Sequence, residues 1–502
     1  SGLTDCSGLE NIDTVHGDLD IYNNDSLISL NGLQNLKYIT ENFFLSHYYG
    51  STIFTEANLN EIGGSITIQD NNNLINLAGL ENLTKINGGF NIKKNQSLNS
   101  IYELNNLNEI VGNLVIEENP ILKSLYGLDN ILPGSISNIF IRRNDSLSNC
   151  DALSICNYLS NPVGSINIYN NATGCSSPPE IADSCGFVLP CLPFGNYFLT
   201  LQEDIDNFQY DYPGCSDLGG ELHIRYMDIT NLVGLSQITS VESNLFINSC
   251  HNLTDLNGLD NLRTVGGSFD ISANSQLQTT DGLSGLQFIG GTFEIHNNVD
   301  LYELTGCNQL SFIGEDLELN YNPNLNIISG FSQLDSIGRE FYFRENNWVR
   351  NFSCFQNLSR VGSDFVLIGN NRLNSLIDLA SLTSIGGDLY IWGNDSLMSL
   401  VGLDNIEHNS IENLSISYND VLNDCDVESI CAYLVDPGGD IEINNNRVGC
   451  SNTYQVLLAC SVGDQEIEST SSIIFYPNPA NNNLFISSNN GEIITQIAIF
   501  NH

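Results

Sequence analysis

One repeat unit of this chain runs from Leu253 to Leu277 and reads Leu-Thr-Asp-Leu-Asn-Gly-Leu-Asp-Asn-Leu-Arg-Thr-Val-Gly-Gly-Ser-Phe-Asp-Ile-Ser-Ala-Asn-Ser-Gln-Leu. The pattern returns every 24 residues, with anchor leucines at positions 74, 98, 122, 253, 277, 301, 325, 373 and 397, Val349 in the same place, and one-residue slips at Leu147 and Leu422. A fixed period of this length is typical of a solenoid, in which each coil buries its apolar edge only against neighbouring coils. The sequence therefore predicts a long stack of coils.

Each coil is expected to hold one short strand of the form L-x-I, such as Phe269-Asp-Ile271. Side chains alternate along a strand, so the first and third residues point inward and the middle one points outward. Two glycines before many of the strands, such as Gly266-Gly267, indicate a tight bend that a side chain would obstruct. Right-handed crossovers are the general expectation for parallel coils. The predicted fold class is all-β, built from right-handed parallel β-solenoids.

An asparagine stands three residues after the inward isoleucine of most strands. A stacked column of buried amides can satisfy the carbonyl groups of successive bends, which water does not reach. We therefore expect these asparagines to be structural. Cys250 takes an asparagine position and Cys307 a leucine position, so both are predicted to be buried free thiols, whereas Tyr48 in an asparagine position predicts a distorted coil. The column comprises Asn24, Asn71, Asn95, Asn119, Asn144, Asn274, Asn298, Asn322, Asn346, Asn370, Asn394 and Asn419.

The chain is strongly acidic, with 15 Lys and Arg against 59 Asp and Glu and a formal net charge of -44. A nucleic-acid-binding protein needs a basic patch that releases counterions, so we expect no nucleic-acid partner. The acidity favours solubility and the binding of cations. No apolar run approaches the ~18 residues of a membrane-spanning helix, so no transmembrane segment is predicted.

Ten of the 14 cysteines are expected to form disulfides. Two quartets share one spacing and are offset by 275 residues, and Cys191 with Cys215 forms a further expected pair. Zinc is the alternative, but no C-x-x-C pair or nearby histidine supports tetrahedral coordination. Each quartet allows three pairings, of which we prefer 150–156 with 175–185, and 425–431 with 450–460. Such disulfides predict an exported protein. The quartets are Cys150, Cys156, Cys175, Cys185 and Cys425, Cys431, Cys450, Cys460.

The duplicated quartets mark the ends of two solenoids. In each, the repeat gives way to a short helical pattern that opens on an expected N-cap aspartate, Asp151 or Asp426, and is followed by a proline. A segment from Leu201 to Phe208 is predicted to be a helical cap at the start of the second solenoid. The expected domains are a first solenoid over 1–190 with a disulfide C-cap, a second over 191–460 with caps at both ends, and a polar linker over 461–472.

The repeats resemble the receptor L domains of growth-factor receptors, which are short β-helices related to leucine-rich repeats. The resemblance covers about residues 9–460 and rests on the leucine, glycine and asparagine positions given above. It departs from leucine-rich repeats proper, because the gap from Asn to Leu is one residue longer and no helix is expected on the convex side.

The tail from Ile473 to Ile486 reads Ile-Ile-Phe-Tyr-Pro-Asn-Pro-Ala-Asn-Asn-Asn-Leu-Phe-Ile. It resembles the opening of a type IX secretion C-terminal sorting domain, with its Y-P-N-P-A-x-x-x-L signature. The resemblance implies a partial β-sandwich sorting domain over 473–502, the type IX secretion machinery as a partner, and a protein that is secreted or held at a bacterial cell surface. Sorting domains of this kind are longer than the segment that remains here, so the tail is expected to be truncated or to have another use.

No catalytic motif stands out: the chain has no H-E-x-x-H, no G-x-S-x-G and no phosphate-binding loop. We therefore expect a non-enzymatic, adhesin-like surface protein that recognises glycan or protein ligands. The first alternative is a structural subunit of an extracellular filament or surface layer. The second is a β-helix enzyme that acts on polysaccharides, which rests on analogy of fold alone.

The outward strand positions of the second solenoid suggest two sites, because neighbouring coils stack them about 4.8 Å apart. One column contains Tyr342 and Tyr390, and the next contains Arg344 and Trp392. An exposed tryptophan among tyrosines is unfavourable unless it stacks against something. These four residues are therefore predicted to form a ligand platform, with a covering loop or domain as the alternative.

Three carboxylates, Asp270, Glu294 and Glu318, occupy the same outward position on successive coils. Like charges stacked in register destabilise a sheet, and a divalent ion such as calcium would relieve the repulsion with oxygen ligands alone. We therefore expect a calcium site here, although screening by water and salt is the simpler alternative. No other cofactor is expected.

The two ends of the chain suggest head-to-tail self-assembly. The first solenoid begins in mid-repeat, with Cys6 in a leucine position, and an uncapped coil presents unpaired strand groups. The β-prone segment Ile493-Ile-Thr-Gln-Ile-Ala-Ile-Phe500 could add to that edge in the next subunit, a contact that does not close on itself and yields fibres.

Overall fold

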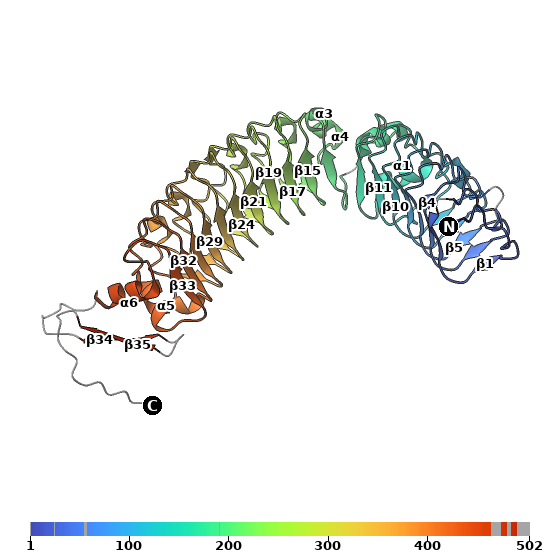
Figure 1. The fold of residues 1–502 in the computed structure, drawn as a ribbon. Helices are drawn as coiled ribbons and strands as arrows, with labels where there is room; N and C mark the ends of the chain where they lie inside the picture. Colours follow the sequence, from blue (N-terminus) through green and yellow to red (C-terminus); the bar gives the residue numbers. More distant parts are fainter. Residues whose placement is uncertain are drawn as a thin grey trace.

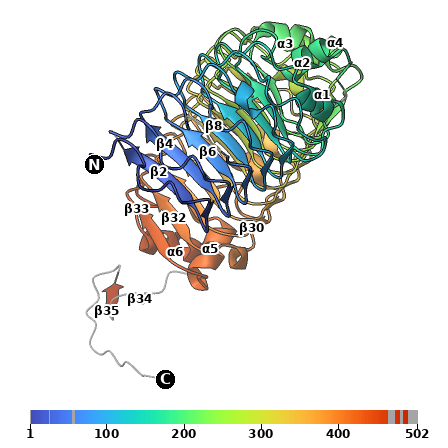
Figure 2. The ribbon, with the colours of Figure 1, turned by 90° about the vertical axis from the view of Figure 1, so that its right-hand side faces the viewer.

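The computed structural model describes residues 2–24, 26–54, 58–189, 191–462, 473–478 and 483–488. It shows two parallel β-solenoids that follow one another along an arch (Figure 1). In Figure 2 the strands β2, β4, β6 and β8 of the first solenoid lie side by side, as their pairing requires. The predicted all-β solenoid fold is confirmed.

Each solenoid has one long sheet, and all strand pairs within it are parallel. The first sheet contains, in spatial order, β12 (Ile166–Tyr169), β11 (Ile139–Arg142), β10 (Leu114–Glu117), β8 (Phe90–Lys93), β6 (Ile66–Gln69), β4 (Phe43–Tyr48) and β2 (Leu19–Asn24). The second contains β13 (Tyr197–Leu199), β15 (Leu222–Arg225), β17 (Leu245–Asn248), β19 (Phe269–Ser272), β21 (Phe293–His296), β24 (Leu317–Asn320), β27 (Phe341–Arg344), β29 (Phe365–Ile368), β31 (Leu389–Trp392), β32 (Leu414–Ser417) and β33 (Ile441–Asn444).

Two-residue strands form a second, narrower sheet in each solenoid. In the first solenoid they are β1 (Thr14–Val15), β3 (Tyr38–Ile39), β5 (Glu61–Ile62), β7 (Lys85–Ile86) and β9 (Glu109–Ile110). In the second they are β14 (Asp217–Leu218), β16 (Ser240–Val241), β18 (Thr264–Val265), β20 (Phe288–Ile289), β23 (Phe312–Ile313), β26 (Ser336–Ile337), β28 (Arg360–Val361) and β30 (Ser384–Ile385), with β22 (Glu303–Leu304) and β25 (Ile327–Ile328) as a separate pair. Single 3-10 turns, such as Asp281–Leu283, complete several coils.

The core is a set of stacked columns between the two sheets. The anchor leucines and the first and third strand residues are buried, as the alternation predicts, except for Leu19 and Ile441 in the terminal strands β2 and β33, which are partly buried. In the middle of the second solenoid phenylalanines replace several aliphatic residues, and the rings of Phe341 and Phe365 stack with centroids 4.8 Å apart. Because each coil contacts only its neighbours, the stack holds the outward side chains in a fixed register.

The asparagine column is a continuous hydrogen-bonded ladder. The amide Nδ2 of Asn298 donates to the carbonyl of Ile271 at 2.8 Å, and its Oδ1 accepts from the backbone N–H of Asn274 at 3.0 Å. The same bonds recur from coil to coil and satisfy buried backbone groups that water does not reach. The structural role predicted for these asparagines is confirmed from Asn71 onward, whereas Asn24 is half-buried and its Nδ2 donates to the carbonyl of Tyr22 in its own strand. Asn171 and Asn446 extend the ladder into the caps.

The exceptions in the ladder fit into it. Cys250 and Cys307 are buried free thiols, as predicted, and burial raises the pKa of each to about 12. Tyr48 is buried, and its backbone N–H donates to Asn71 Oδ1 at 2.8 Å. Its ring lies where Gly50 leaves room, since a Cβ on Gly50 would overlap the phenol. The coil therefore accommodates the tyrosine within the ladder, and the residues that follow, 55–57, lie outside the described part of the chain.

A second feature of the turn was not predicted. The residue before each ladder position adopts a left-handed backbone conformation, which costs a residue with a side chain about 1–2 kcal/mol. Glycine fills this position only at Gly369 and Gly393 among the coils with this turn. The non-glycine residues with positive φ are Asn23, His47, Asp70, Lys94, Glu118, Arg143, Asn170, Tyr226, Ser249, Ala273, Asn297, Tyr321, Glu345, Tyr418 and Asn445.

The first glycine of these pairs lies in a bend that a side chain would obstruct, as predicted, and the obstructing atoms belong to the preceding coil. A Cβ on Gly290 would lie 2.1 Å from the carbonyl oxygen of Gly266 in the preceding coil. A Cβ on Gly338 or Gly362 would likewise overlap the carbonyl oxygen of the glycine one coil before it. The first glycine is therefore needed for the close approach of adjacent coils.

All ten predicted cysteines form disulfides, but the predicted pairing within the quartets was wrong. Cys150 bonds Cys175 and Cys156 bonds Cys185, and the second quartet follows the same pattern with Cys425–Cys450 and Cys431–Cys460. The Cys191–Cys215 bond is confirmed. Cysteines one coil apart stack directly, with Cα atoms 5.6 Å apart for Cys150 and Cys175, whereas the other two bonds join the paired cap helices.

The cap helices are α1 (Leu153–Ser160) with α2 (Pro178–Cys185), and α5 (Glu428–Val435) with α6 (Thr453–Val462). The predicted N-caps Asp151 and Asp426 were wrong by one residue, because the N-cap residues are Ala152 and Val427, without side-chain capping bonds. Both are buried, so packing in the core determines the residue type at this position.

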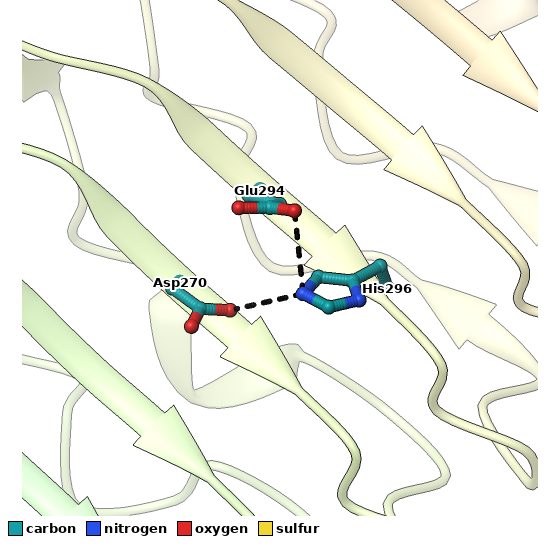
Figure 3. Close-up of side chains that lie close together, drawn as sticks. All are labelled: Asp270, Glu294 and His296. Carbon is teal, nitrogen blue, oxygen red and sulfur yellow. Dashed lines mark ion pairs between the residues drawn. The ribbon is translucent and has the colours of Figure 1, made fainter.

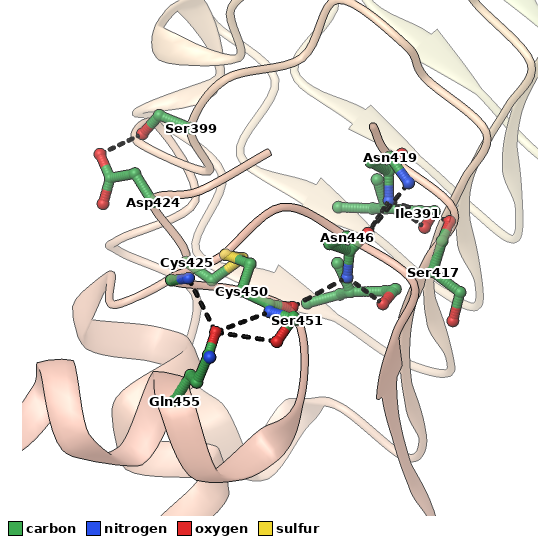
Figure 4. The surroundings of a disulfide bond; sticks show 12 residues. Ile391, Ser399, Ser417, Asn419, Asp424, Cys425, Asn446, Cys450, Ser451 and Gln455 are labelled. Atoms are coloured by element: carbon green, nitrogen blue, oxygen red, sulfur yellow. Dashed lines mark hydrogen bonds between the residues drawn. A yellow bond between two sulfur atoms is a disulfide. The ribbon is translucent and has the colours of Figure 1, made fainter. Parts of the chain in front are cut away.

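A polar side chain closes the last turn of each solenoid. Gln455 Oε1 accepts hydrogen bonds from the backbone N–H of Gly449 and from Ser451. Figure 4 shows Gln455 and Ser451 beside the Cys425–Cys450 bond. Glu180 accepts equivalent bonds from Gly174 and Ser176 in the first cap. The ladder ends here on Asn446, whose Nδ2 donates to Ile416 and Cys450 carbonyls.

The second solenoid begins with a helical cap, as predicted, in two pieces: α3 (Gln202–Asp206) and α4 (Phe208–Asp211). The two long sheets meet without merging, and Asn196 N–H donates to the Ile166 carbonyl at 3.3 Å. The rings of Tyr169, Phe198, His223 and Phe246 stack in sequence across this junction, with centroids 4.1, 4.5 and 4.7 Å apart.

In the tail, β34 (Ile473–Asn478) pairs antiparallel with β35 (Asn483–Ser488). Helix α6 includes 461 and 462 of the expected linker, and residues 463–472 lie outside the described part of the chain. The segment from Ile493 to Phe500, predicted to complete another subunit, also lies outside it. No helix in the described residues is long and apolar enough to cross a membrane.

Candidate ligand-binding face

The outward columns of the second solenoid have the register that the repeat predicts. Asp270, Glu294, Glu318, Tyr342, Val366 and Tyr390 pair in that order along the sheet. Ser272, His296, Asn320, Arg344, Ile368 and Trp392 form the neighbouring column. The sheet face therefore divides into an acidic stretch and an aromatic stretch.

The aromatic stretch consists of two clusters. Tyr342 and Arg344 lie together on β27, and Tyr390 and Trp392 lie together on β31, with Val366 and Ile368 of β29 between them. Trp392 is 38% exposed, whereas the other three predicted platform residues are half-buried. The structure thus places the four residues on one face but not in one continuous patch.

Arg344 is held by aromatic neighbours. Its guanidinium carbon lies 5.0 Å from the centroid of the Tyr321 ring, and a hydrogen bond with Tyr342 raises its pKa. Its Nε is buried and has no hydrogen-bond partner among the described residues. The charge is therefore oriented at the face and not fully satisfied by the protein.

Two further aromatic residues extend the stretch, Tyr321 beside Arg344 and Tyr418 beside Trp392, and a third, Trp348, lies at a neighbouring turn against Arg372. The Tyr418 ring lies 5.6 Å from Trp392, and Tyr418 is 50% exposed. Tyr321 and Tyr418 occupy the left-handed turn position, and Trp348 follows its ladder asparagine by two residues. The sequence prediction missed them because alternation along a strand does not place turn residues. The fixed period of the turn was the signal that could have found them.

The acidic stretch brings together two of the three predicted carboxylates and a histidine (Figure 3). His296 Nε2 lies 3.2 Å from Glu294 Oε1 and 3.7 Å from Asp270 Oδ1. The candidate ligand atoms of these residues all lie within 4.8 Å of one another. Glu318 is not part of this group, and it accepts a hydrogen bond from Asn320 at 3.2 Å.

The electrostatics of this cluster disfavour its full ionisation. Burial raises the pKa of Glu294, and Asp270 raises it further, whereas His296 lowers it. Burial, with Glu294 as the next cause, also raises the pKa of Glu318. Asp270 Oδ1 is buried and accepts no hydrogen bond from a described residue. Two carboxylates and an imidazole nitrogen are a donor set that divalent transition metals accept, whereas calcium prefers oxygen ligands alone.

Comparison with known proteins identifies part of this solenoid. Residues 214–309 match the model of the receptor L domain family. This segment runs from β14 to the turn after β22 and includes Asp270, Glu294 and His296. No curated protein matches the chain. The match and the parallel sheets fit a fold like that of L domains and leucine-rich repeats.

Proposed function

We propose that this chain is an extracellular, non-enzymatic binding protein that recognises a glycan or protein ligand on the sheet face of the second solenoid. The observation that carries the proposal is the cluster of exposed aromatic side chains around Trp392 on a rigid stack of coils. Aromatic rings present large contact area at small entropic cost, which suits them to ligand platforms. The receptor L domain match and the five disulfides support an extracellular binding role.

The test is binding of the purified chain to a glycan array and to cell-surface protein preparations. Tyr390→Ala and Trp392→Ala are expected to weaken binding about tenfold or more, which corresponds to the loss of ~1.4 kcal/mol. The control is Tyr102→Ala, which removes a 62% exposed ring from the first solenoid. Undiminished binding by both platform variants would contradict the proposal.

For localisation, the proposal is export by the type IX route to a bacterial surface or the medium. The Y-P-N-P-A segment at Tyr476 supports it, together with the strand pair β34 and β35. Deletion of residues 473–502 is expected to retain the protein inside cells of a host with this secretion system. Export of the truncated chain at the normal level would exclude a sorting role for the tail.

We further propose a divalent cation at Asp270 and Glu294. If His296 is the third ligand, Zn²⁺ raises the melting temperature and His296→Ala removes the effect. If Glu318 is the third ligand, as the sequence predicted, Ca²⁺ raises the melting temperature and Glu318→Gln removes the effect. A ligand at 100 times its Kd stabilises a fold by about 2.7 kcal/mol. Melting temperatures that do not differ among Ca²⁺, Zn²⁺ and chelator would exclude a cation here.

The second candidate function is a subunit of a filament or surface layer. The observation in its favour is that β2 pairs with β4 alone at the end of the seven-stranded sheet, so one of its edges has no strand partner among the described residues. Electron microscopy of the purified chain distinguishes filaments from discrete particles. If the tail of one subunit pairs with the β2 edge of the next, deletion of residues 471–502 is expected to abolish assembly. In the same contact Cys6 would link subunits.

A further inference from the structure

A hollow of about 360 Å³ lies at the turns that follow β27, β29 and β31. Two columns of turn residues form its walls, each with the 24-residue period of the coils. Arg372 and Ser396 belong to one column, Arg350, Asn374 and Met398 form the other, and Asp395 and Val421 complete the lining. Trp348 stands one coil before Arg372 in the first column and contacts it from outside the lining. The N–H of Asn374 donates to the carbonyl of Arg350 at 3.0 Å, which fixes the register of the second column.

The charge of this hollow differs from that of the rest of the chain. Only 15 basic residues occur against 59 acidic ones, yet two arginines, Arg350 and Arg372, line this one hollow. Neither makes an ion pair with any residue that the structure describes, although carboxylates are abundant. Asp395 is the single acidic residue in the lining. An arginine pair left without carboxylate partners is suited to an anionic ligand.

Arg372 is held in place by an aromatic ring. Its guanidinium carbon lies 3.5 Å from the centroid of the Trp348 ring, the closest cation–π contact in the described chain. Stacking of this kind orients the plane of the guanidinium and leaves its N–H groups free to donate along that plane. Trp348 itself remains 42% exposed, so the ring still presents apolar surface beside the charge.

We propose that this hollow binds an acidic sugar, with the carboxylate or sulfate group at Arg350 and Arg372. The side-chain amide of Asn374 would donate hydrogen bonds to sugar hydroxyls and accept hydrogen bonds from them. The carboxylate of Asp395 would only accept them. The exposed part of Trp348 would contact the apolar face of the sugar ring. This inference rests on the proposed function, because it assigns a ligand class to the binding role proposed for the second solenoid.

The strong negative charge of the chain means that an acidic sugar would bind only at a specific site. A chain with a formal charge of -44 repels polyanions at long range, so non-specific attraction does not account for binding of an acidic sugar. Binding of a short acidic oligosaccharide must therefore come from a local site with fixed donors.

The experiment measures binding of the full chain to trigalacturonic acid, to a sulfated galactose trisaccharide and to neutral galactotriose by isothermal titration calorimetry. At least one acidic probe is expected to bind about tenfold more tightly than the neutral one, and the two acidic probes distinguish carboxylate from sulfate. Arg350→Gln and Arg372→Gln are each expected to remove this preference. Arg360→Gln is the matched control, since Arg360 is exposed on β28 of the other sheet and makes no ion pair with a described residue.

Equal binding of acidic and neutral probes, or a preference that both arginine variants retain, would overturn the acidic-sugar assignment. The proposed function then still stands if binding of the neutral probe depends on Trp392. Absence of binding to all three probes also overturns the assignment. Binding to cell-surface protein preparations then tests the proposed binding function independently of the sugar.

Discussion

At the scale of single residues, the buried asparagines decide whether a coil can stack on the next one. Each ladder amide donates to a strand carbonyl of the preceding coil and accepts from the backbone N–H of the ladder asparagine in that same coil, as Asn298 does with Ile271 and Asn274. The role of these residues could be predicted from sequence, because a polar residue at a fixed place in an apolar repeat needs a buried partner. The reach of the ladder into the caps, at Asn171 and Asn446, could not be predicted, since the repeat spacing changes there.

Asn298→Ala is expected to lower the free energy of unfolding by about 2–4 kcal/mol, because it leaves the Ile271 carbonyl and the Asn274 N–H unpaired in the core. Asn324→Ala is the control, since its exposed amide donates to the Val299 carbonyl at the surface. Chemical denaturation of both variants measures the difference. Equal loss of stability in the two variants would contradict the role assigned to the ladder.

At the scale of one turn, the left-handed residue before each ladder position is a site of strain. Alternation and capping rules could not reveal it, because asparagine, lysine, glutamate and tyrosine all occur there. Ala273→Gly is expected to stabilise the fold by up to about 1 kcal/mol, since glycine adopts positive φ without a steric penalty. Ala380→Gly is the control at a right-handed position, φ -60, and is expected to destabilise by about 0.5–1 kcal/mol. Thermal unfolding of both variants measures the difference. Destabilisation by both substitutions would contradict the claim that Ala273 is strained in its left-handed conformation.

At the scale of one cap, α4 contains a carboxyl group that resists ionisation. Burial, with Asp183 as the next cause, raises the pKa of Asp211 from 3.8 to about 6. The folded state therefore holds this proton more tightly than the unfolded state, so the ionised group destabilises the fold above pH 6. This destabilisation is relieved as the pH falls from about 6 to 3.8. Asp211→Asn is expected to raise the melting temperature at pH 7 and to have little effect below pH 3.8, and an equal effect at both values would contradict this cause.

At the scale of the whole molecule, the duplicated cysteine quartets predicted two solenoids, and the period of the repeat predicted the stack and the outward columns of the long sheet. It did not predict the disulfide pairing, although 25 residues between Cys150 and Cys175 is nearly one coil, which brings them into contact. Nor did it predict that His296 joins the acidic stretch, that Tyr418 joins the aromatic one, or that Trp348 stacks on Arg372. These residues come together through the conformation of turns and side chains, which the strand pattern does not specify.

The central claim is that the second solenoid presents the ligand-binding face. Hydroxyl-radical footprinting of the intact chain, with and without the ligand bound most tightly on the array, tests it directly. The account predicts reduced labelling of Trp348, Trp392 and Tyr418 in the complex, with unchanged labelling of Tyr102 and Tyr126 in the first solenoid, all of which are exposed in the free chain. Protection confined to the first solenoid, or no change at the second, would contradict the account.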